Sequence, residues 1–232
     1  MKCDEKELSR SEPFKPESPF VIVCEGFQDA GFICALLRHL RIGNCDVTFP
    51  KKKRDGANGE GGIAAMVSLL SAVPSVEGIA IIRDSDNDAA QSFETACAAY
   101  AKPFDVPEQP FTVKRGRHKT TGVFLMPGKG RTGALEHLLL AAVFATHLPL
   151  ANCIRSLEIC NQRATNWSEN KKAKMKMQCV IASFCQDDPG CSLGFIWHKG
   201  ADNPIDFTSP VFQELAAFLI DFATPPVPVG QA

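Results

Sequence analysis

The sequence predicts an α/β protein: a mainly parallel sheet that is covered by helices on both faces and continued by a helical C-terminal extension. Two observations predict this fold class. Between residues 20 and 126, short apolar segments rich in β-branched residues alternate with segments whose apolar residues recur at helical spacing. From Gly133 onward, the apolar spacing is mainly helical. Strands separated by helices pair in parallel through right-handed crossovers, which places helices on both faces of the sheet.

Each element of the first half has its own signal. The strands are short apolar runs, and the helices have apolar side chains on one face or are rich in alanine. In chain order we expect strand 20–24, helix 29–40, strand 46–49, helix 63–73, strand 78–83, helix 88–101 and strand 123–126. Residues 51–62 are basic and then rich in glycine, which is typical of a loop.

The second half is expected to contain four helices, at 134–147, 150–163, 170–184 and 210–222, because apolar residues recur there near the helical period. We therefore divide the chain into a partly mobile lead-in (1–18), an α/β core (19–128) and a helical extension packed on the core (129–232). The lead-in is charged and lacks the apolar segment of a signal peptide.

Composition limits the class of protein. With 232 residues, of which 45% are hydrophobic and 22% charged, the chain can bury a full core. Its formal net charge of -1 means that local basic patches or a metal ion would have to hold any polyanion. The ten cysteines lie in apolar patterns without a Cys-x-x-Cys pair, which favours buried thiols over disulfides or zinc. No apolar run is long enough for a membrane span, so we expect a cytoplasmic protein.

Acidic residues follow two of the expected strands. Glu25 comes directly after strand 20–24, and Asp29 follows it by about one helical turn. Asp84 and Asp86 end strand 78–83, where extended geometry would point both side chains the same way. Ligands gather at the carboxyl ends of parallel strands, and clustered carboxylates suit Mg²⁺ or Mn²⁺. Alternatively, Asp29 merely caps or charges a helix N-terminus, and Asp84 and Asp86 belong to an ordinary polar turn and helix cap.

The combination of these acids resembles the Toprim domain. A strand followed by Glu25, Gly26 and a helix, with a later strand that ends in Asp84-Ser85-Asp86, is similar to the signature of that family. The resemblance implies a Toprim-type, Rossmann-like fold, in which the first Glu and the Asp-x-Asp pair act at a metal-dependent phosphoryl-transfer site.

Later segments resemble an uncharacterised Toprim-like family related to the OLD (overcoming lysogenization defect) nucleases. These segments are residues 133–140, 174–178 and 209–215. The resemblance implies that Glu136 helps to bind a second metal and that Lys174 or Lys172 supplies a cation at the phosphate. The alternatives are a surface glutamate in a first helical turn and a solvated lysine face.

Two basic stretches fall in expected loops and could bind backbone phosphates of a nucleic acid. The first consists of Lys51, Lys52, Lys53 and Arg54, and the second runs from Lys114 to Lys119 and includes Arg115 and Arg117. We expect them to lie along the path of a strand that passes the acids. The glycine-rich segment 128–133 lacks the order of a phosphate-binding loop, so no ATPase is expected.

The sequence thus predicts a metal-dependent nuclease that hydrolyses phosphodiester bonds, of DNA rather than RNA, with Mg²⁺ or Mn²⁺. The expected catalytic residues are Glu25, Asp84, Asp86 and Lys174, and the expected metal ligands are Glu25, Asp29, Asp84, Asp86 and Glu136. The main alternative is a non-catalytic module that binds nucleic acid or a separate partner ATPase. Nucleotidyl transfer, as in primases, is a further alternative, although no primase zinc-binding domain is present.

Overall fold

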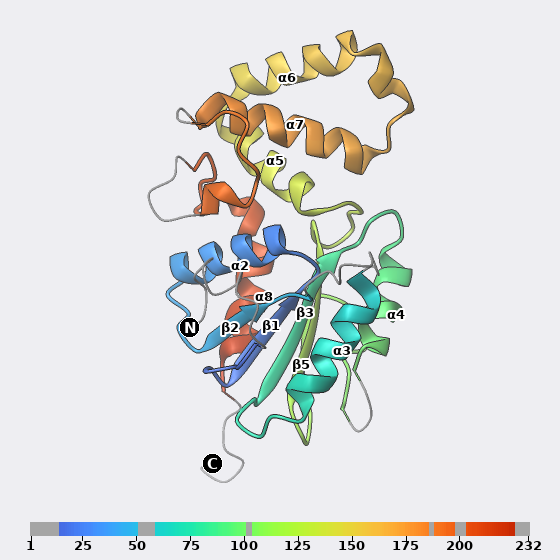
Figure 1. Ribbon diagram of the computed structural model, residues 1–232, viewed down its shortest axis with the longest axis vertical. Helices are drawn as coiled ribbons and strands as arrows, with labels where there is room; N and C mark the ends of the chain where they lie inside the picture. Colours follow the sequence, from blue (N-terminus) through green and yellow to red (C-terminus); the bar gives the residue numbers. More distant parts are fainter. Residues whose placement is uncertain (1–13, 51–58, 101–103, 186–187, 198–202, 226–232) are drawn as a thin grey trace.

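The computed structural model describes residues 14–50, 59–100, 104–185, 188–197 and 203–225, without the side chains of 59–61, 162 and 163 (Figure 1). Its centre is a five-stranded sheet of order β2-β1-β3-β5-β4. The strands are β1 (Phe20–Cys24), β2 (Cys45–Thr48), β3 (Gly78–Asp84), β4 (Thr112–Arg115) and β5 (Thr120–Met126). All neighbouring strands pair in parallel except β4, which is antiparallel to β5 at the edge.

Helices cover both faces of the sheet because the central strands are apolar on both sides (Figure 1). One face packs against α2 (Phe27–His39) and α8 (Gln213–Ala223), and the other packs against α3 (Gly59–Ser71) and α4 (Ala89–Ala98). Alternate residues of β1 show the division. Phe20 and Ile22 belong to the first core cluster, whereas Val21 and Val23 belong to the second.

The helical extension stands beyond the carboxyl ends of the strands (Figure 1). It contains α5 (Leu135–Thr146), α6 (Leu148–Cys160), η1 (Gln162–Asn166), α7 (Glu169–Phe184), η2 (Phe195–Trp197) and η3 (Pro210–Phe212). The chain then returns to the sheet as α8, where Phe222 lies edge-on to Phe20 with ring centroids 5.4 Å apart. The last helix of the chain therefore lies on the sheet and adds to its core.

The structure confirms the predicted fold class and the four predicted strands, with boundaries shifted by a few residues. Strand β4 was missed. It is short, lies at the sheet edge and carries Lys114 and Arg115, so its sequence looked like a basic loop. Among the described residues, no cysteine forms a disulfide. None of the described helices is long and apolar enough to cross a membrane. The lead-in before residue 14 lies outside the described residues.

Candidate acidic site at the carboxyl edge of the sheet

Four acidic side chains come together where β1 and β3 end. These strands are neighbours, and Cys24 at the end of β1 pairs with Ile82 near the end of β3. Glu25 follows β1 directly, and Asp84 is the last residue of β3. Asp29 comes from the first turn of α2 and Glu136 from the first turn of α5. We call Glu25, Asp29, Asp84 and Glu136 the acidic cluster.

Asp29 lies inside the cluster and also fixes the start of α2. Its Oδ2 accepts a hydrogen bond of 3.0 Å from the backbone N–H of Gly26, the N-cap residue. Burial, followed by the negative charges of Glu25 and Glu136, raises the pKa of Asp29 to about 7. The capping interpretation made from the sequence is thus correct, but it does not exclude a second role in the cluster.

Asp84 is the most strongly perturbed acid of the cluster. Burial raises its pKa to about 9, and the charges of Asp29, Glu25 and Glu136 add to the effect. Its Oδ1 accepts a hydrogen bond of 3.0 Å from the backbone N–H of Leu135, which opens α5. This one donor holds the carboxyl in place, but it does not offset the surrounding negative charge.

Glu25 is paired with an arginine from the neighbouring strand. Its Oε2 lies 3.9 Å from Nε of Arg83, which is buried within β3. This distance is too long for a hydrogen bond, and within the described residues Oε2 is buried without a hydrogen-bond partner. A buried carboxylate oxygen in this condition has free coordination capacity, so it can accept a cation or a donor group of a ligand.

The two residues suggested by the OLD-related segments also lie at this site. Glu136 is buried, and its charge contributes to the raised pKa values of Asp29 and Asp84. Lys174 is exposed on α7, yet its charge acts in the opposite direction on the pKa of Asp29. Both residues are therefore close to the acids, although they come from helices that lie far beyond Asp84 in the chain.

Asp86 leaves the extended geometry of β3, so the expectation of an extended Asp-x-Asp pair is wrong. Strand β3 ends at Asp84, and Asp86 has a left-handed backbone with φ of 49°. Its N–H donates to the carbonyl oxygen of Gly133, and its Oδ1 accepts a hydrogen bond of 2.9 Å from Asn170 on α7. Asp86 is exposed, and its charge is not among those that raise the pKa of Asp84.

The second basic stretch lies at the opposite edge of the sheet. Arg115 pairs with Thr120 at the amino end of β5, whereas Asp84 pairs with Met126 at its carboxyl end, about 20 Å away for seven strand residues. Arg115 forms an ion pair of 2.9 Å with Asp221, and the buried Lys119 donates to the carbonyl oxygens of Val73 and Val76. The second basic stretch therefore does not lie beside the acids, and its contribution to nucleic-acid binding stays a prediction.

Of the remaining residues predicted to contact phosphate, one lies far from the acids and four lie outside the described residues. Arg117 lies in the turn between β4 and β5, at the same distant edge as Arg115. The first basic stretch, Lys51, Lys52, Lys53 and Arg54, lies outside the described residues. Its contribution to nucleic-acid binding stays a prediction.

The donor set partly fits a divalent metal ion. Within the described ranges, no three His, Cys, Asp or Glu side chains are placed so that they could hold a metal ion as they stand. Mg²⁺, however, is commonly bound through one or two carboxylates and keeps several waters. Glu25 has a buried oxygen without a hydrogen-bond partner, and Asp84 lies among like charges, so this pair fits such a cation.

Sequence reasoning missed Arg83, Asn170 and the backbone N–H of Leu135. Arg83 had a detectable signal, because a charged residue inside an apolar strand needs a partner when it is buried. The other two had none. Their contacts join α7 and α5 to the end of β3, and these long-range contacts leave no periodic pattern in the sequence.

Comparison with known proteins gives one match. A family model described as "Protein of unknown function (DUF3226)" matches residues 19–224, which is most of the chain. Neither a search of curated proteins nor a search of solved structures gave a match.

Proposed function

We propose that this chain, which belongs to the family described as "Protein of unknown function (DUF3226)", hydrolyses phosphodiester bonds of nucleic acid with a divalent metal ion. The observation that carries the proposal is the acidic cluster at the carboxyl edge of the sheet. Four carboxyl groups share a partly buried space, and burial together with their mutual repulsion raises the pKa of two of them. A cation at this place would relieve the repulsion.

Glu25 and Asp84 are the residues that we expect to hold Mg²⁺ or Mn²⁺. When bound, such an ion lowers the pKa of a coordinated water and neutralises charge on the phosphate. Asp29 and Glu136 adjoin this pair and could hold a second ion, as the resemblance to OLD-related proteins implies. The Leu135 N–H keeps the Asp84 carboxyl oriented, and the Gly26 N–H does the same for Asp29.

Lys174 is the residue that we expect to contact the phosphate. It is exposed at the rim of the cluster, and a lysine ammonium provides three donors on a flexible stem. It can neutralise charge that develops on a phosphate oxygen. We no longer expect Asp86 to bind the first metal directly, because its carboxylate accepts a hydrogen bond from Asn170. We propose instead that it holds α7 on the turn after β3.

A non-catalytic module that binds nucleic acid or a separate ATPase is the second candidate. The observation that favours it is that the described acids do not form a complete three-ligand metal site. A docking surface would use the exposed charges of the site and would not depend on the buried Glu25 oxygen.

A cleavage assay separates the two candidates. Purified protein is incubated with single-stranded, duplex and supercoiled DNA and with RNA, in Mg²⁺ or Mn²⁺, beside the variant Glu25→Gln. The matched control is Glu108→Gln, because Glu108 is an exposed glutamate that pairs with Lys114 on β4. The nuclease predicts cleavage that Glu25→Gln reduces by about 10²–10³-fold and that Glu108→Gln leaves unchanged. Nucleic-acid binding without cleavage, undiminished by Glu25→Gln, would support the docking module.

A further inference from the structure

Trp167 presents an oriented aromatic ring beside the start of α7. It follows η1, precedes the N-cap residue Ser168 and is partly exposed. The ammonium of Lys171 lies over the ring, 4.6 Å from its centroid. Because this cation–π contact joins the ring to the first turn of the helix, the indole has a defined orientation. A partly exposed, oriented ring is the kind of surface on which unpaired bases stack.

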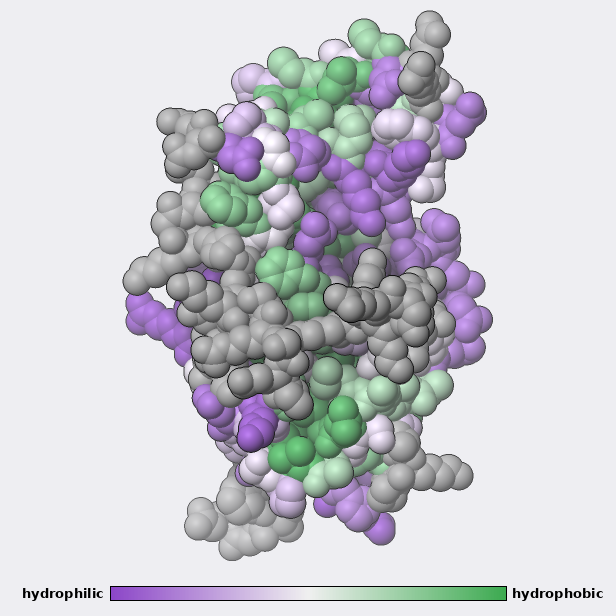
Figure 2. Space-filling model, viewed as in Figure 1, coloured by the Kyte–Doolittle hydropathy of each residue, from purple (hydrophilic) through white to green (hydrophobic). Residues whose placement is uncertain are grey.

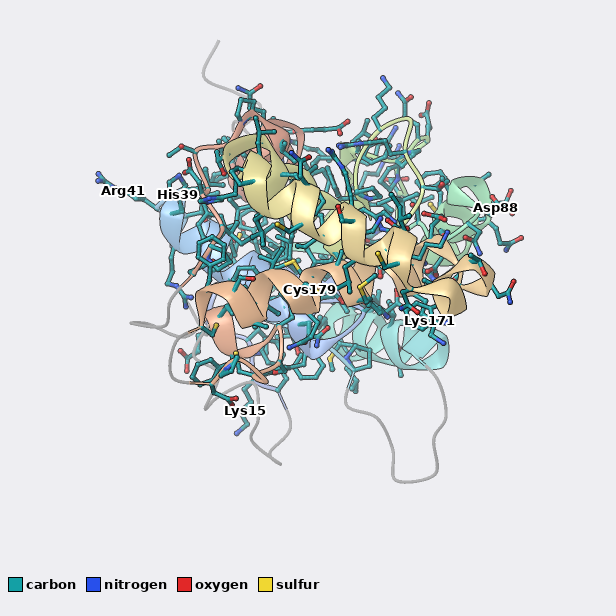
Figure 3. All side chains as sticks on the ribbon, turned by 90° about the horizontal axis from the view of Figure 1, so that it is seen from above. Lys15, His39, Arg41, Asp88, Lys171 and Cys179 are labelled. Carbon is teal, nitrogen blue, oxygen red and sulfur yellow. The ribbon has the colours of Figure 1, made fainter. Side chains whose placement is uncertain are left out.

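This end of α7 is attached to the segment that carries Asp84. Asn170, between Trp167 and Lys171 in the chain, donates a hydrogen bond of 2.9 Å to Asp86, two residues after Asp84. In Figure 3, which looks down on the extension, the labelled Lys171 lies on the same side of the molecule as Asp88, the N-cap residue of α4. The start of α7, which follows Trp167 in the chain, is therefore held at the turn that leaves the acidic cluster.

Cationic side chains continue from the ring to the acids. Lys174 lies one helical turn after Lys171, about 4.5 Å further along the axis, and its charge reaches Asp29. Figure 2 shows hydrophilic side chains gathered where the extension meets the α/β layer. An aromatic ring followed by two lysines and then by the acidic cluster is the order that a single strand would meet on its way to cleavage.

We propose that Trp167 is a stacking platform for an unpaired base next to the phosphodiester bond at the acidic cluster, so that the site takes single-stranded nucleic acid. This inference rests on the proposed function for the identity of the site. Lys171 has two roles in it: it orients the ring and contacts the adjacent phosphate. A base inside a closed duplex has both faces stacked on its neighbours, so it cannot use this platform.

Tryptophan fluorescence tests the proposal directly, because the chain has only two tryptophans and Trp197 is 3% exposed. A short single-stranded oligonucleotide is titrated in Ca²⁺ into the wild type, Trp167→Phe and Trp167→Ala, and a relaxed circular duplex serves as the comparison. We expect saturable quenching in the wild type and none in Trp167→Phe, which keeps its affinity. Trp167→Ala should raise the Kd for the single strand by about 5–100-fold and leave that for the duplex unchanged.

A matched pair of charge variants shows whether single-strand binding depends on the lysine beside Trp167 or only on the total positive charge of the protein. Arg155 on α6 lies 6.0 Å over the ring of Phe144, so it is also an exposed cation over an aromatic ring. We expect Lys171→Ala to weaken single-strand binding and to reduce the slope of log K against log salt by about 1, whereas Arg155→Ala changes neither. Equal effects of the two variants would contradict the proposal.

The outcomes also distinguish this proposal from the proposed function. Cleavage that depends on Glu25 but proceeds equally well on single strands with Trp167→Ala would overturn the platform and leave the nuclease intact. Quenching and the loss of affinity in Trp167→Ala, without cleavage by the wild type, would support the platform and refute the nuclease. Binding without quenching, or no binding of single strands by the wild type, would overturn the platform.

Discussion

Buried carboxylates have different surroundings at the two ends of the strands, which we call the amino edge and the carboxyl edge of the sheet. Near the amino edge, Asp46 of β2 is fully buried, and its carboxylate accepts hydrogen bonds from the N–H groups of Glu17 and Ser18 and from the Ser18 hydroxyl, at 2.6–2.8 Å. At the carboxyl edge, Asp84 accepts one backbone N–H and is surrounded by other acids. The first arrangement satisfies a charge for stability, and the second leaves it available to a ligand.

The amino edge should give the largest change in stability. Asp46→Ala leaves two backbone N–H groups and a hydroxyl without their acceptor, which we expect to lower the free energy of unfolding by about 3 kcal/mol. The loss corresponds to a decrease in Tm of about 6–12 °C for a chain of this size. Chemical denaturation of the two proteins at pH 7 measures it. A loss below about 1 kcal/mol would mean that this carboxylate is not the structural anchor that its contacts indicate.

Lys119 should behave as a structural residue of the same edge. Its ammonium donates to two backbone carbonyl groups, so Lys119→Met should cost about 1–2 kcal/mol of unfolding free energy. Because it lies far from the acidic cluster, the same variant should bind nucleic acid with unchanged affinity. A binding titration of the folded variant checks this second expectation, and a weaker affinity there would restore Lys119 as a phosphate contact.

Replacing an acid at the carboxyl edge should raise the free energy of unfolding, whereas Asp46→Ala lowers it. Asp84→Asn keeps an acceptor for the Leu135 N–H and removes a carboxyl that the folded protein holds mostly protonated at pH 8, because burial and the neighbouring acids raise its pKa to about 9. In a metal-free buffer at pH 8, we expect it to raise the free energy of unfolding by on the order of 1 kcal/mol. Thermal unfolding in EDTA measures the change. If Asp84→Asn destabilised the protein as Asp46→Ala does, the contrast between the two edges would be lost.

The pH dependence of stability sharpens the same contrast. The pKa values of Asp29 and Asp84 are raised from 3.8 to about 7 and about 9, respectively. Between pH 3.8 and these raised values, the folded protein binds more protons than the unfolded chain. Stability contributed by the protonated carboxyls is therefore complete at low pH and is lost as the pH rises through about 7 and about 9. Denaturation from pH 5 to pH 9 without metal should show this decline, and Asp84→Asn should make it shallower.

The sequence was sufficient to predict which acids lie at the carboxyl edge of the sheet, but not how the neighbouring turn and the last helix are placed. Glu25 and Asp84 were recognisable because each ends an apolar run, and the end of a buried parallel strand defines a position in space. Asp86 was placed wrongly because its left-handed backbone depends on contacts with Gly133 and Asn170, which are distant in the chain. Helix α8 was predicted as an element, but its return to the sheet depends on aromatic packing against Phe20.

Calorimetric titration with Mn²⁺ at pH 8 measures whether the carboxyl edge of the sheet binds a divalent cation. We expect saturable binding by the wild type with release of protons, since the acids with raised pKa values must ionise to hold the ion. We also expect Glu25→Gln and Asp84→Asn to weaken this binding by at least tenfold, whereas Asp88→Asn, a change at an exposed helix cap, leaves it unchanged. Equal Mn²⁺ binding by the wild type, Glu25→Gln and Asp84→Asn would contradict these expectations.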